Sequence, residues 1–392
     1  MKRGVRDARW FVSCGPITFI PLYIRYYLIS ASSWPAMYSG GFRSRFSSRS
    51  ANGPGHPRPK KNLAFPSRAH KVAAMATLES LRALYGQPFL SLVTRARSVH
   101  IAHHPENEIQ RCELVNIKGG GCPEDCRYCA QSARYTTGLT AHRLLDASAL
   151  RRAAEEARNH GATRLCLGAA WRGLKEESDR LDEVCRLVEA IRDEGLEICV
   201  TLGLLGATAA KRLHEAGVRI YNHNLNTGPN FYGKVATTHT FADRIATLHA
   251  AQEAGLRLCS GGILGMGESV DDRLEMLLAL HKLDPAPESI PLNLLVPIPG
   301  TPLASRRPVN PFDLVRLIGV ARILLPRARI RLAAGRRSLS AEAQALCFLA
   351  GANSLFIGER LLTTPNQSFD ADRSLLEVLG MEASASELPE VF

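Results

Sequence analysis

The segment 121–129 contains three cysteines, with three residues between the first two and two residues between the last two. Three thiolates on one short loop can hold three irons of a cubane iron–sulfur cluster and leave the fourth iron open to a small molecule. A structural zinc site would need four ligands, and no second cysteine pair or matching pair of histidines follows nearby. The three residues could instead include a disulfide pair or be unrelated thiols. The spacing of Cys122, Cys126 and Cys129 favours a catalytic iron–sulfur cluster.

A second set of cysteines lies inside short apolar runs that are typical of strands: Cys166, Cys199 and Cys259. Alternate side chains of a barrel strand point into the lumen, so three inward thiols from three strands could meet there. A buried cysteine taken singly is commonly a small hydrophobic residue, which is the competing interpretation. Three matching strand positions favour a second metal–sulfur site.

Arg331 also lies inside a candidate strand, between apolar neighbours. An inward arginine is more often half of a buried ion pair than a metal ligand, because guanidinium is almost never deprotonated. The residues alone predict an anion-binding role for it. The remaining cysteines show no convergence, and we interpret them as bystanders: Cys14, Cys112, Cys185 and Cys347.

Two further segments follow candidate strands and could hold a ligand. The glycines of 261–268 would let the backbone approach a ligand closely, although such a loop can also be an ordinary strand-to-helix turn. The segment 221–227 contains three asparagines, whose amides offer donors and acceptors suited to a urea or a ribose. His223, within this segment, is predicted to be packed or hydrogen-bonded rather than catalytic.

Beyond residue 112, short apolar runs alternate with amphipathic helical stretches. The candidate strands are 114–117, 164–167, 197–202, 219–224, 257–263, 289–296, 330–333 and 354–357. The candidate helices between and after them are 147–160, 179–194, 207–216, 241–254, 270–281, 311–325 and 340–351. This order predicts an α/β fold, a (β/α)8 TIM-type barrel whose closure the sequence leaves open, preceded by an N-terminal helical extension.

The division of the chain follows from composition. Residues 1–75 are rich in Arg and Ser and contain one acidic residue, Asp7, which predicts a leader of the mitochondrial transit type. A membrane anchor at 10–29 is disfavoured by Arg25 and two prolines, and Met37 or Met75 could instead be the initiator. The further predicted units are a helical extension at 76–112, the barrel at 113–370 and a tail at 371–392.

The formal net charge of +12 does not indicate nucleic-acid binding by the folded part. Residues 1–75 carry thirteen Lys and Arg against one acid, and the other 36 basic and 36 acidic residues cancel. The chain has ten cysteines without the clustering of a secreted disulfide scaffold, which favours reduced thiols or metal ligation.

Between residues 76 and 366 the sequence resembles the biotin synthases, a family of radical S-adenosylmethionine (SAM) enzymes. The resemblance rests on these separate blocks: GCPEDCRYC, TRLCLGAAW, YNHNLNT, CSGGILGMGE, PLNLLVPIPGTPL and CFLAGANSLFIGERLLTTPN. The three-cysteine spacing marks the superfamily, whereas the strand cysteines with the arginine mark this member of it.

The resemblance implies the following ligands and contacts. The [4Fe–4S] cluster, whose open iron chelates SAM, would be held by Cys122, Cys126 and Cys129. A deeper [2Fe–2S] cluster would be held by Cys166, Cys199, Cys259 and Arg331, which corrects the anion-binding role inferred above. SAM would contact Tyr128, Ala169, Asn224, Asn226, Ile263 and Val296. Dethiobiotin would contact Asn222, Asn224 and Asn293 at its ureido ring, with Thr363 and Thr364 at its carboxylate.

By the same resemblance, the reaction would be the insertion of sulfur from the [2Fe–2S] cluster into dethiobiotin, begun by a 5′-deoxyadenosyl radical from SAM. The implied partners are a ferredoxin- or flavodoxin-type electron donor, iron–sulfur assembly proteins and a second copy of the chain. One departure is Asn226, where the family has Asp at the SAM ribose, so cofactor affinity is in question. Rival functions are another radical SAM enzyme, such as a lipoyl synthase, and a non-catalytic iron–sulfur scaffold or redox sensor.

Overall fold

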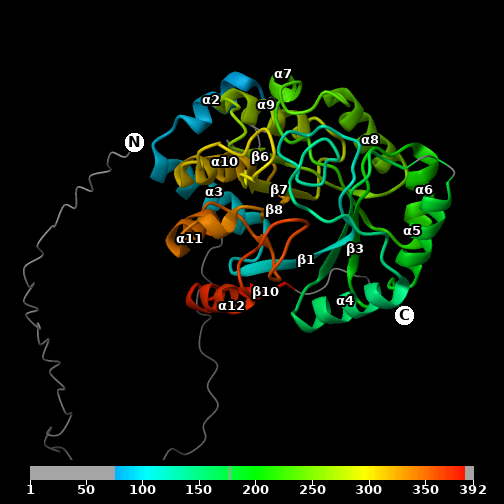
Figure 1. Ribbon diagram of the computed structural model, residues 1–392. Helices are drawn as coiled ribbons and strands as arrows, with labels where there is room; N and C mark the ends of the chain where they lie inside the picture. The colour runs from blue at the N-terminus through cyan, green and yellow to red at the C-terminus, as the bar shows by residue number, and fades with distance from the viewer. Residues whose placement is uncertain (1–75, 175, 177, 385–392) are drawn as a thin grey trace, which may run out of the picture. The chain divides into compact units, whose positions relative to one another are not determined.

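The centre of the fold is a closed ring of parallel strands, which occupy eight positions around it (Figure 1). The structure is a computed structural model that describes residues 76–174, 176 and 178–384. The predicted leader at 1–75 lies outside the described residues. The strands are β1 Glu108–Lys118, β2 Arg164–Ala169, β3 Glu197–Thr201, β4 Ile220–Asn222, β5 Arg257–Cys259, β6 Gly262–Leu264, β7 Ser289–Leu294, β8 Arg329–Leu332, β9 Ser354–Phe356 and β10 Glu382–Ala383.

Parallel pairing runs from β1 through β5 to β7, β8 and β9, and β9 pairs back with β1. The predicted barrel is therefore confirmed, and it is closed. The predicted fifth strand is divided into β5 and β6, because the chain turns at Ser260 and Gly261 to pair twice with β7. A Cβ on Gly261 would lie 2.0 Å from the carbonyl oxygen of Pro291, so this close approach requires glycine.

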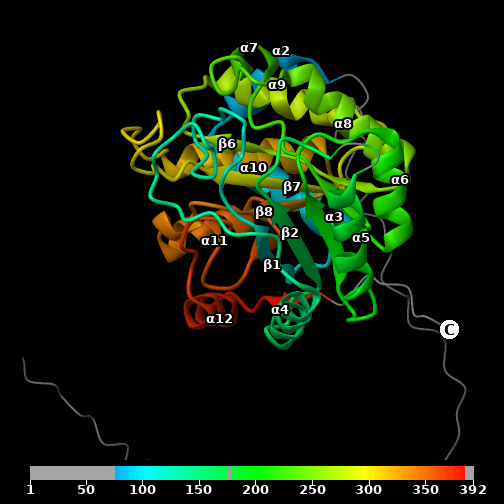
Figure 2. The ribbon, with the colours of Figure 1, turned by 45° about the vertical axis from the view of Figure 1, so that its right-hand side comes forward.

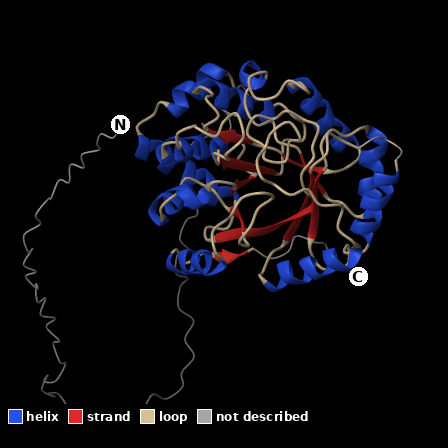
Figure 3. Cartoon of the chain, viewed as in Figure 1, coloured by secondary structure: helices blue, strands red, loops and turns tan. Residues whose placement is uncertain are grey.

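Helices surround the strands on the outside (Figures 2 and 3). They are α2 Leu78–Tyr85, α3 Phe89–His103, α4 Ala147–Asn159, α5 Asp179–Glu189, α6 Ala207–Ala216, α7 Pro229–Tyr232, α8 Phe241–Glu253, α9 Val270–His281, α10 Pro311–Leu324, α11 Ala341–Leu349 and α12 Phe369–Val378, with a short 3-10 turn η1 at Arg336–Ser338. Most begin at a residue whose side chain accepts a first-turn backbone N–H, as the capping preference of Ser, Thr, Asp and Asn predicts: Thr77, Asp146, Ser178, Thr240, Ser269, Asn310, Ser340 and Ser368.

The two ends of the barrel differ from the sequence prediction. Helices α2 and α3 form the expected extension, but strand β1 begins at Glu108, inside the range 76–112 that was predicted to be helical. The range 371–392, predicted as a tail, contains most of α12 and then β10. Strand β10 pairs in parallel with the first residues of β1. Residues 385–392 lie outside the described residues. No helix among the described residues is long and apolar enough to cross a membrane.

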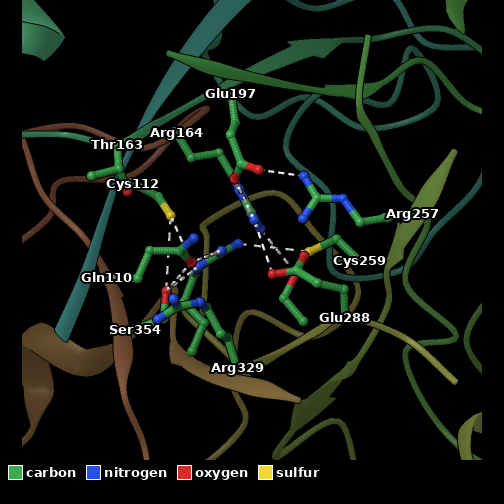
Figure 4. Close-up of polar contacts among 12 residues, drawn as sticks. Gln110, Cys112, Thr163, Arg164, Glu197, Arg257, Cys259, Glu288, Arg329 and Ser354 are labelled. Atoms are coloured by element: carbon green, nitrogen blue, oxygen red, sulfur yellow. Dashed lines mark hydrogen bonds and ion pairs between the residues drawn. The ribbon is translucent and has the colours of Figure 1, made fainter. Parts of the chain in front are cut away.

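The strand register places polar side chains in layers inside the barrel. Arg164 of β2 lies opposite Glu197 of β3, and two residues further along the same strands Cys166 lies opposite Cys199. The Arg164 guanidinium contacts Glu197 at 2.7 Å and Glu288 at 2.9 Å, and Arg257 also pairs with Glu197 (Figure 4). An ionic layer therefore lies directly beneath a layer of thiols.

Helix α12 is held to the barrel by a buried ion pair between Arg336 and Asp372. Both side chains are at most 3% exposed, and Nη1 of the arginine lies 2.7 Å from Oδ1 of the carboxylate. Removing one partner of such a pair leaves an uncompensated buried charge, which costs far more than the pair itself contributes. The pair therefore fixes where the C-terminal helix docks.

Replacing Asp372 by Ala should lower the free energy of unfolding by about 3–5 kcal/mol, because Arg336 would remain buried without its carboxylate. Asp370→Ala is the matched control on the same helix, since the Asp370 side chain is 80% exposed and pairs with Arg373 at the surface. Urea unfolding of the cluster-free proteins measures both. Equal, small losses in the two variants would contradict the role of the buried pair.

Candidate functional site

A cavity of about 320 Å³ opens at the carboxyl ends of the barrel strands, where functional groups of this fold gather. It is lined by most of the predicted site residues: Cys122, Cys126, Tyr128, Cys129, Cys166, Ala169, Asn222, Asn224, Asn226, Ile263, Asn293, Val296, Thr363 and Thr364. The other three predicted residues, Cys199, Cys259 and Arg331, are fully buried behind it. One cavity thus connects the cysteine loop with the thiols inside the barrel.

The cysteine loop follows β1 and is fixed by backbone hydrogen bonds. Cys122 bonds through its backbone to Gln131 and Ala133, so the loop closes on itself. Asp125 accepts hydrogen bonds from the backbone N–H groups of Thr237 and Thr238, at 2.9 and 3.2 Å. Burial alone would raise the pKa of this carboxyl, but these hydrogen bonds outweigh it and hold the pKa well below its usual range. The three thiols are therefore carried by a preformed loop.

The sequence analysis did not identify a series of hydrogen-bonded side chains that lies beside the cysteine loop. His239 contacts Glu124 through Nδ1 at 2.5 Å and Arg244 through Nε2 at 3.0 Å. Arg244 must donate to Nε2, so the neutral ring carries its proton on Nδ1 and donates to Glu124. Arg244 also donates to the carbonyl oxygen of Asn224 at 2.8 Å and to the hydroxyl of Tyr232. A fixed cation thus lies at the cavity wall between the cysteine loop and β4.

Nothing in the sequence singles out Arg244, because this residue looks like an ordinary charged residue in the first turn of an amphipathic helix. Arg244 is half-buried, and the structure places it among the cavity-lining residues. A guanidinium at a cavity wall matches a carboxylate group of a ligand in charge and geometry.

The three predicted amides are oriented by the backbone around them. Asn224 accepts from the N–H of Gly261 at 3.0 Å, and Asn293 donates to Gly262 and accepts from Ala334, each at 3.0 Å. Asn222 donates to the thiol of Cys259 at 3.1 Å. The amide set is therefore preorganised, and one of its members directly contacts the inner thiols.

The inner thiols belong to one tightly packed group. Cys199 lies within hydrogen-bonding reach of both Cys166 and Cys259, which come from strands β2 and β5. Arg331 donates to Cys259 at 3.6 Å, as well as to Ser354 at 2.9 Å. The hydrogen bonds of this arginine go to thiol, hydroxyl and amide groups rather than to a carboxylate of the described residues, so the ion-pair interpretation of the sequence does not hold there.

The position of Cys112 contradicts the interpretation that the sequence analysis gave it. It was interpreted as a bystander, but it is fully buried in the same small cluster as Cys166, Cys199 and Cys259. The prediction failed because β1 begins at Glu108, earlier than the expected strand, so Cys112 was not recognised as a strand residue. Cys185 and Cys347 do lie on helices, as expected, and Cys14 lies outside the described residues.

Two family models match the chain. One, described as the Radical SAM superfamily, covers residues 116–280, and the other, described as the Biotin and Thiamin Synthesis associated domain, covers residues 291–382. Curated proteins named biotin synthase are similar over most of their length. The protein of Methylobacterium sp. (strain 4-46) is 53% identical over 79% of this chain and 93% of its own. That of Synechococcus sp. (strain JA-3-3Ab) is 52% identical over 78% of this chain and 98% of its own.

The chain belongs to the biotin synthase family. Solved structures share the fold at low sequence identity. Methylornithine synthase (PylB) gives a TM-score of 0.67 at 19% identity, covering 81% of this chain and 97% of its own. The FeFe-hydrogenase maturase HydG from Carboxydothermus hydrogenoformans gives a TM-score of 0.68 at 18% identity, covering 81% of each chain.

The thiol chemistry fits the iron–sulfur clusters of a biotin synthase. No three His, Cys, Asp or Glu side chains of the described residues form a ready site for a single metal ion, whereas the thiolates of an iron–sulfur cluster are distributed among several irons. Burial raises the pKa of Cys126 to about 12 and that of Cys129 to about 11, so iron must displace their protons. Hydrogen bonding to Cys199, aided by Arg331, lowers the pKa of Cys259 to about 5, which favours the ligating thiolate.

The nucleoside side of the cavity fits SAM through buried polar atoms that have no protein partner. Nδ2 of Asn226 and Nε2 of His223 are both buried without a hydrogen bond, on side chains 3% exposed. Asn226 adopts a left-handed backbone with φ of 69°, which Asn and Asp tolerate better than most residues. A hydroxyl group of a ligand would satisfy the orphan donor of Asn226.

Replacing Arg244 by Met should weaken SAM binding to the reconstituted protein by about 1.5–3 kcal/mol, or about tenfold to 150-fold in Kd, because a charged hydrogen-bond donor is lost. Arg373→Met, on the exposed face of α12, is the control and should leave Kd unchanged. Isothermal titration of anaerobic protein measures both. Unaltered affinity in Arg244→Met would rule out a contact between this arginine and the carboxylate of SAM.

Proposed function

We propose that this member of the biotin synthase family inserts sulfur into dethiobiotin to form biotin, with the chemistry confined to the barrel cavity. One observation carries the proposal: one cavity is lined by the thiols of the cysteine loop and by Cys166, the member of the deep thiol group that reaches it. The amide set lies between them, and its Asn222 contacts the deep thiol of Cys259. A substrate held by these amides is next to the sulfur source.

The residues that would hold each group come from the family resemblance, and their placement around and behind one cavity supports the assignment. The loop cysteines, Cys122, Cys126 and Cys129, would hold the [4Fe–4S] cluster, and Cys166, Cys199, Cys259 and Arg331 would hold the [2Fe–2S] cluster. When bound, SAM with the first cluster supplies a 5′-deoxyadenosyl radical, and the second cluster supplies the sulfur atom. The chain's own contribution is position, charge and exclusion of water.

In this proposal, different residues of the cavity lining contact different parts of SAM and dethiobiotin. Arg244 would pair with the SAM carboxylate, while the backbone at Tyr128 and Ile263, with Ala169, Val296, Asn224 and Asn226, would surround its nucleoside. Asn222, Asn224 and Asn293 would hold the ureido ring by hydrogen bonds that a urea can both donate and accept. Thr363 and Thr364 at the cavity wall would meet the carboxylate of dethiobiotin.

Closing the substrate between these walls keeps water and stray hydrogen donors from a reactive carbon. The wall contributes apolar side chains for this purpose, among them Leu114, Leu361 and Leu362. The same wall brings the substrate within reach of the Cys259 layer, since Asn222 lies opposite Cys259 in the strand register. Positioning therefore accounts for the reaction's selectivity.

We also propose the partners and location that the sequence predicts. The acid-poor leader at 1–75 supports a mitochondrial location. A ferredoxin- or flavodoxin-type electron donor, iron–sulfur assembly proteins and a homodimer rest on the family resemblance. The balanced charge of residues 76–392 gives no support to nucleic-acid binding.

The function is tested by anaerobic reconstitution followed by an assay with dethiobiotin, SAM and a reductant. Biotin formation is expected, and SAM cleavage without biotin would favour another radical SAM enzyme instead. Absence of both products from protein with full iron content would favour a scaffold or redox sensor.

Cys126→Ala should abolish SAM cleavage, because the first cluster loses one of its three thiolates. Production of 5′-deoxyadenosine in the presence of reductant measures this. Cys347→Ala is the control, since Cys347 is buried on α11 away from both thiol groups. A variant at Cys126 that cleaves SAM at the wild-type rate would remove the loop from the proposal.

Cys259→Ala should leave the first cluster and SAM cleavage in place while ending sulfur transfer, because only the deep group loses a ligand. Biotin and 5′-deoxyadenosine are measured in the same reaction. Full biotin yield from this variant would overturn the assignment of the deep cluster.

A further inference from the structure

Four cysteines, one more than the [2Fe–2S] assignment uses, pack together inside the barrel. Cys112, Cys199 and Cys259 are fully buried, and Cys166 is 4% exposed. They come from four strands, β1, β3, β5 and β2, and belong to one buried cluster, in which Cys112 lies opposite Arg164 in the strand register, next to the thiol layer. Cys112 has no part in the ligand set that the proposed function assigns.

Cys112 is directly linked to the groups that hold Arg331. Its thiol lies 3.4 Å from Oε1 of Gln110 and 3.8 Å from the hydroxyl of Ser354 (Figure 4). The Arg331 guanidinium donates to the same two atoms, at 3.1 Å and 2.9 Å. The sulfur and the guanidinium therefore share both of their polar neighbours and lie side by side.

This environment differs from that of a cysteine used as a small hydrophobic residue. Such a cysteine packs among apolar side chains, as Cys347 does on its helix. Cys112 instead meets a buried amide and a buried hydroxyl, and the buried cation Arg331 shares both contacts. A thiolate at this position would have a compensating charge beside it.

We propose that Cys112 is an alternative fourth ligand of the deep cluster, able to take the iron position of Arg331 when the guanidinium is withdrawn. The inference rests on the proposed location of the [2Fe–2S] cluster. Thiolate is the usual ligand of such clusters, whereas guanidinium is a poor one because it rarely gives up its proton. Rotation about the single χ1 torsion of Cys112 moves its sulfur, so exchange of the ligand needs no movement of β1.

The exchange would matter for a cluster that gives up sulfur. Removing a sulfide would leave iron with fewer ligands, and an additional thiolate from the same buried cluster of cysteines would retain that iron until the sulfide is replaced. Cys112 would bind iron as a thiolate, and its proton would pass to the Arg331 guanidine as that group leaves the iron. No oxidation or reduction is involved, because the step is a substitution of one ligand for another.

The test compares four proteins: wild type, Arg331→Ala, Arg331→Ala/Cys112→Ser and the control Arg331→Ala/Cys185→Ser. Cys185 is a suitable control because it is a buried thiol on α5, outside the barrel lumen. Each protein is loaded anaerobically with 57Fe and sulfide, and Mössbauer spectra quantify the iron in each kind of cluster. The [4Fe–4S] content reports whether each variant is folded.

Wild type is expected to hold both clusters. Arg331→Ala should keep its [2Fe–2S] cluster with the spectrum of an all-thiolate site, and so should the Cys185 control. The Cys112 double variant should lose deep-cluster iron by about tenfold or more, the scale on which removal of one supporting group weakens a metal site.

Equal deep-cluster iron in Arg331→Ala and in the Cys112 double variant would overturn the inference and leave the proposed function standing. Loss of the deep cluster from Arg331→Ala alone would overturn it as well. A wild type that never takes up a two-iron cluster would remove both the inference and the deep-site assignment.

Discussion

The register of a closed parallel barrel is the constraint on which this site depends. Because side chains alternate along each strand, only every second residue faces the lumen, and pairing with the next strand fixes its depth. Cys166 lies opposite Cys199, and Asn222 lies opposite Cys259. A shift of one residue in any of these strands would turn its functional side chain outward. The proposed cluster ligands and the proposed substrate amides are thus positioned by the same backbone pairing.

The register also places charge beneath the thiols. Arg164, Glu197 and Glu288 are paired in the layer below, and Arg164 donates to the hydroxyl of Ser289 at 3.2 Å. Burial alone would raise the pKa of Glu288, but the attraction of Arg164 outweighs it and lowers the pKa to about 2. Ser289 in turn hydrogen-bonds to Cys259, so the ionic layer connects with the cluster layer. Buried charges are costly unless they are paired. Here the paired charges are linked to the thiol of Cys259 through the hydroxyl of Ser289.

The features that the sequence predicted are those that depend on residues close together in the chain. Strand and helix positions, the cysteine loop and the strand cysteines follow from spacing and periodicity, and the family resemblance supplied the assignment of Arg331. Closure of the barrel, the early start of β1 and the division of the fifth strand depend on pairing between distant segments, which no local pattern encodes. Arg244 and Cys112 were missed for the same reason, because their neighbours come from strands and helices far away in the chain. The contacts on which their proposed roles rest are seen only when those neighbours are placed in space.

The central claim is that one barrel holds two iron–sulfur centres at different depths of a single cavity. Anomalous diffraction at the iron edge from crystals of the fully loaded protein tests this most directly. The account predicts two iron peaks inside the barrel, one beside the loop that carries Cys126 and the other beside Cys199. A single iron peak, or a second peak outside the barrel lumen, would contradict it.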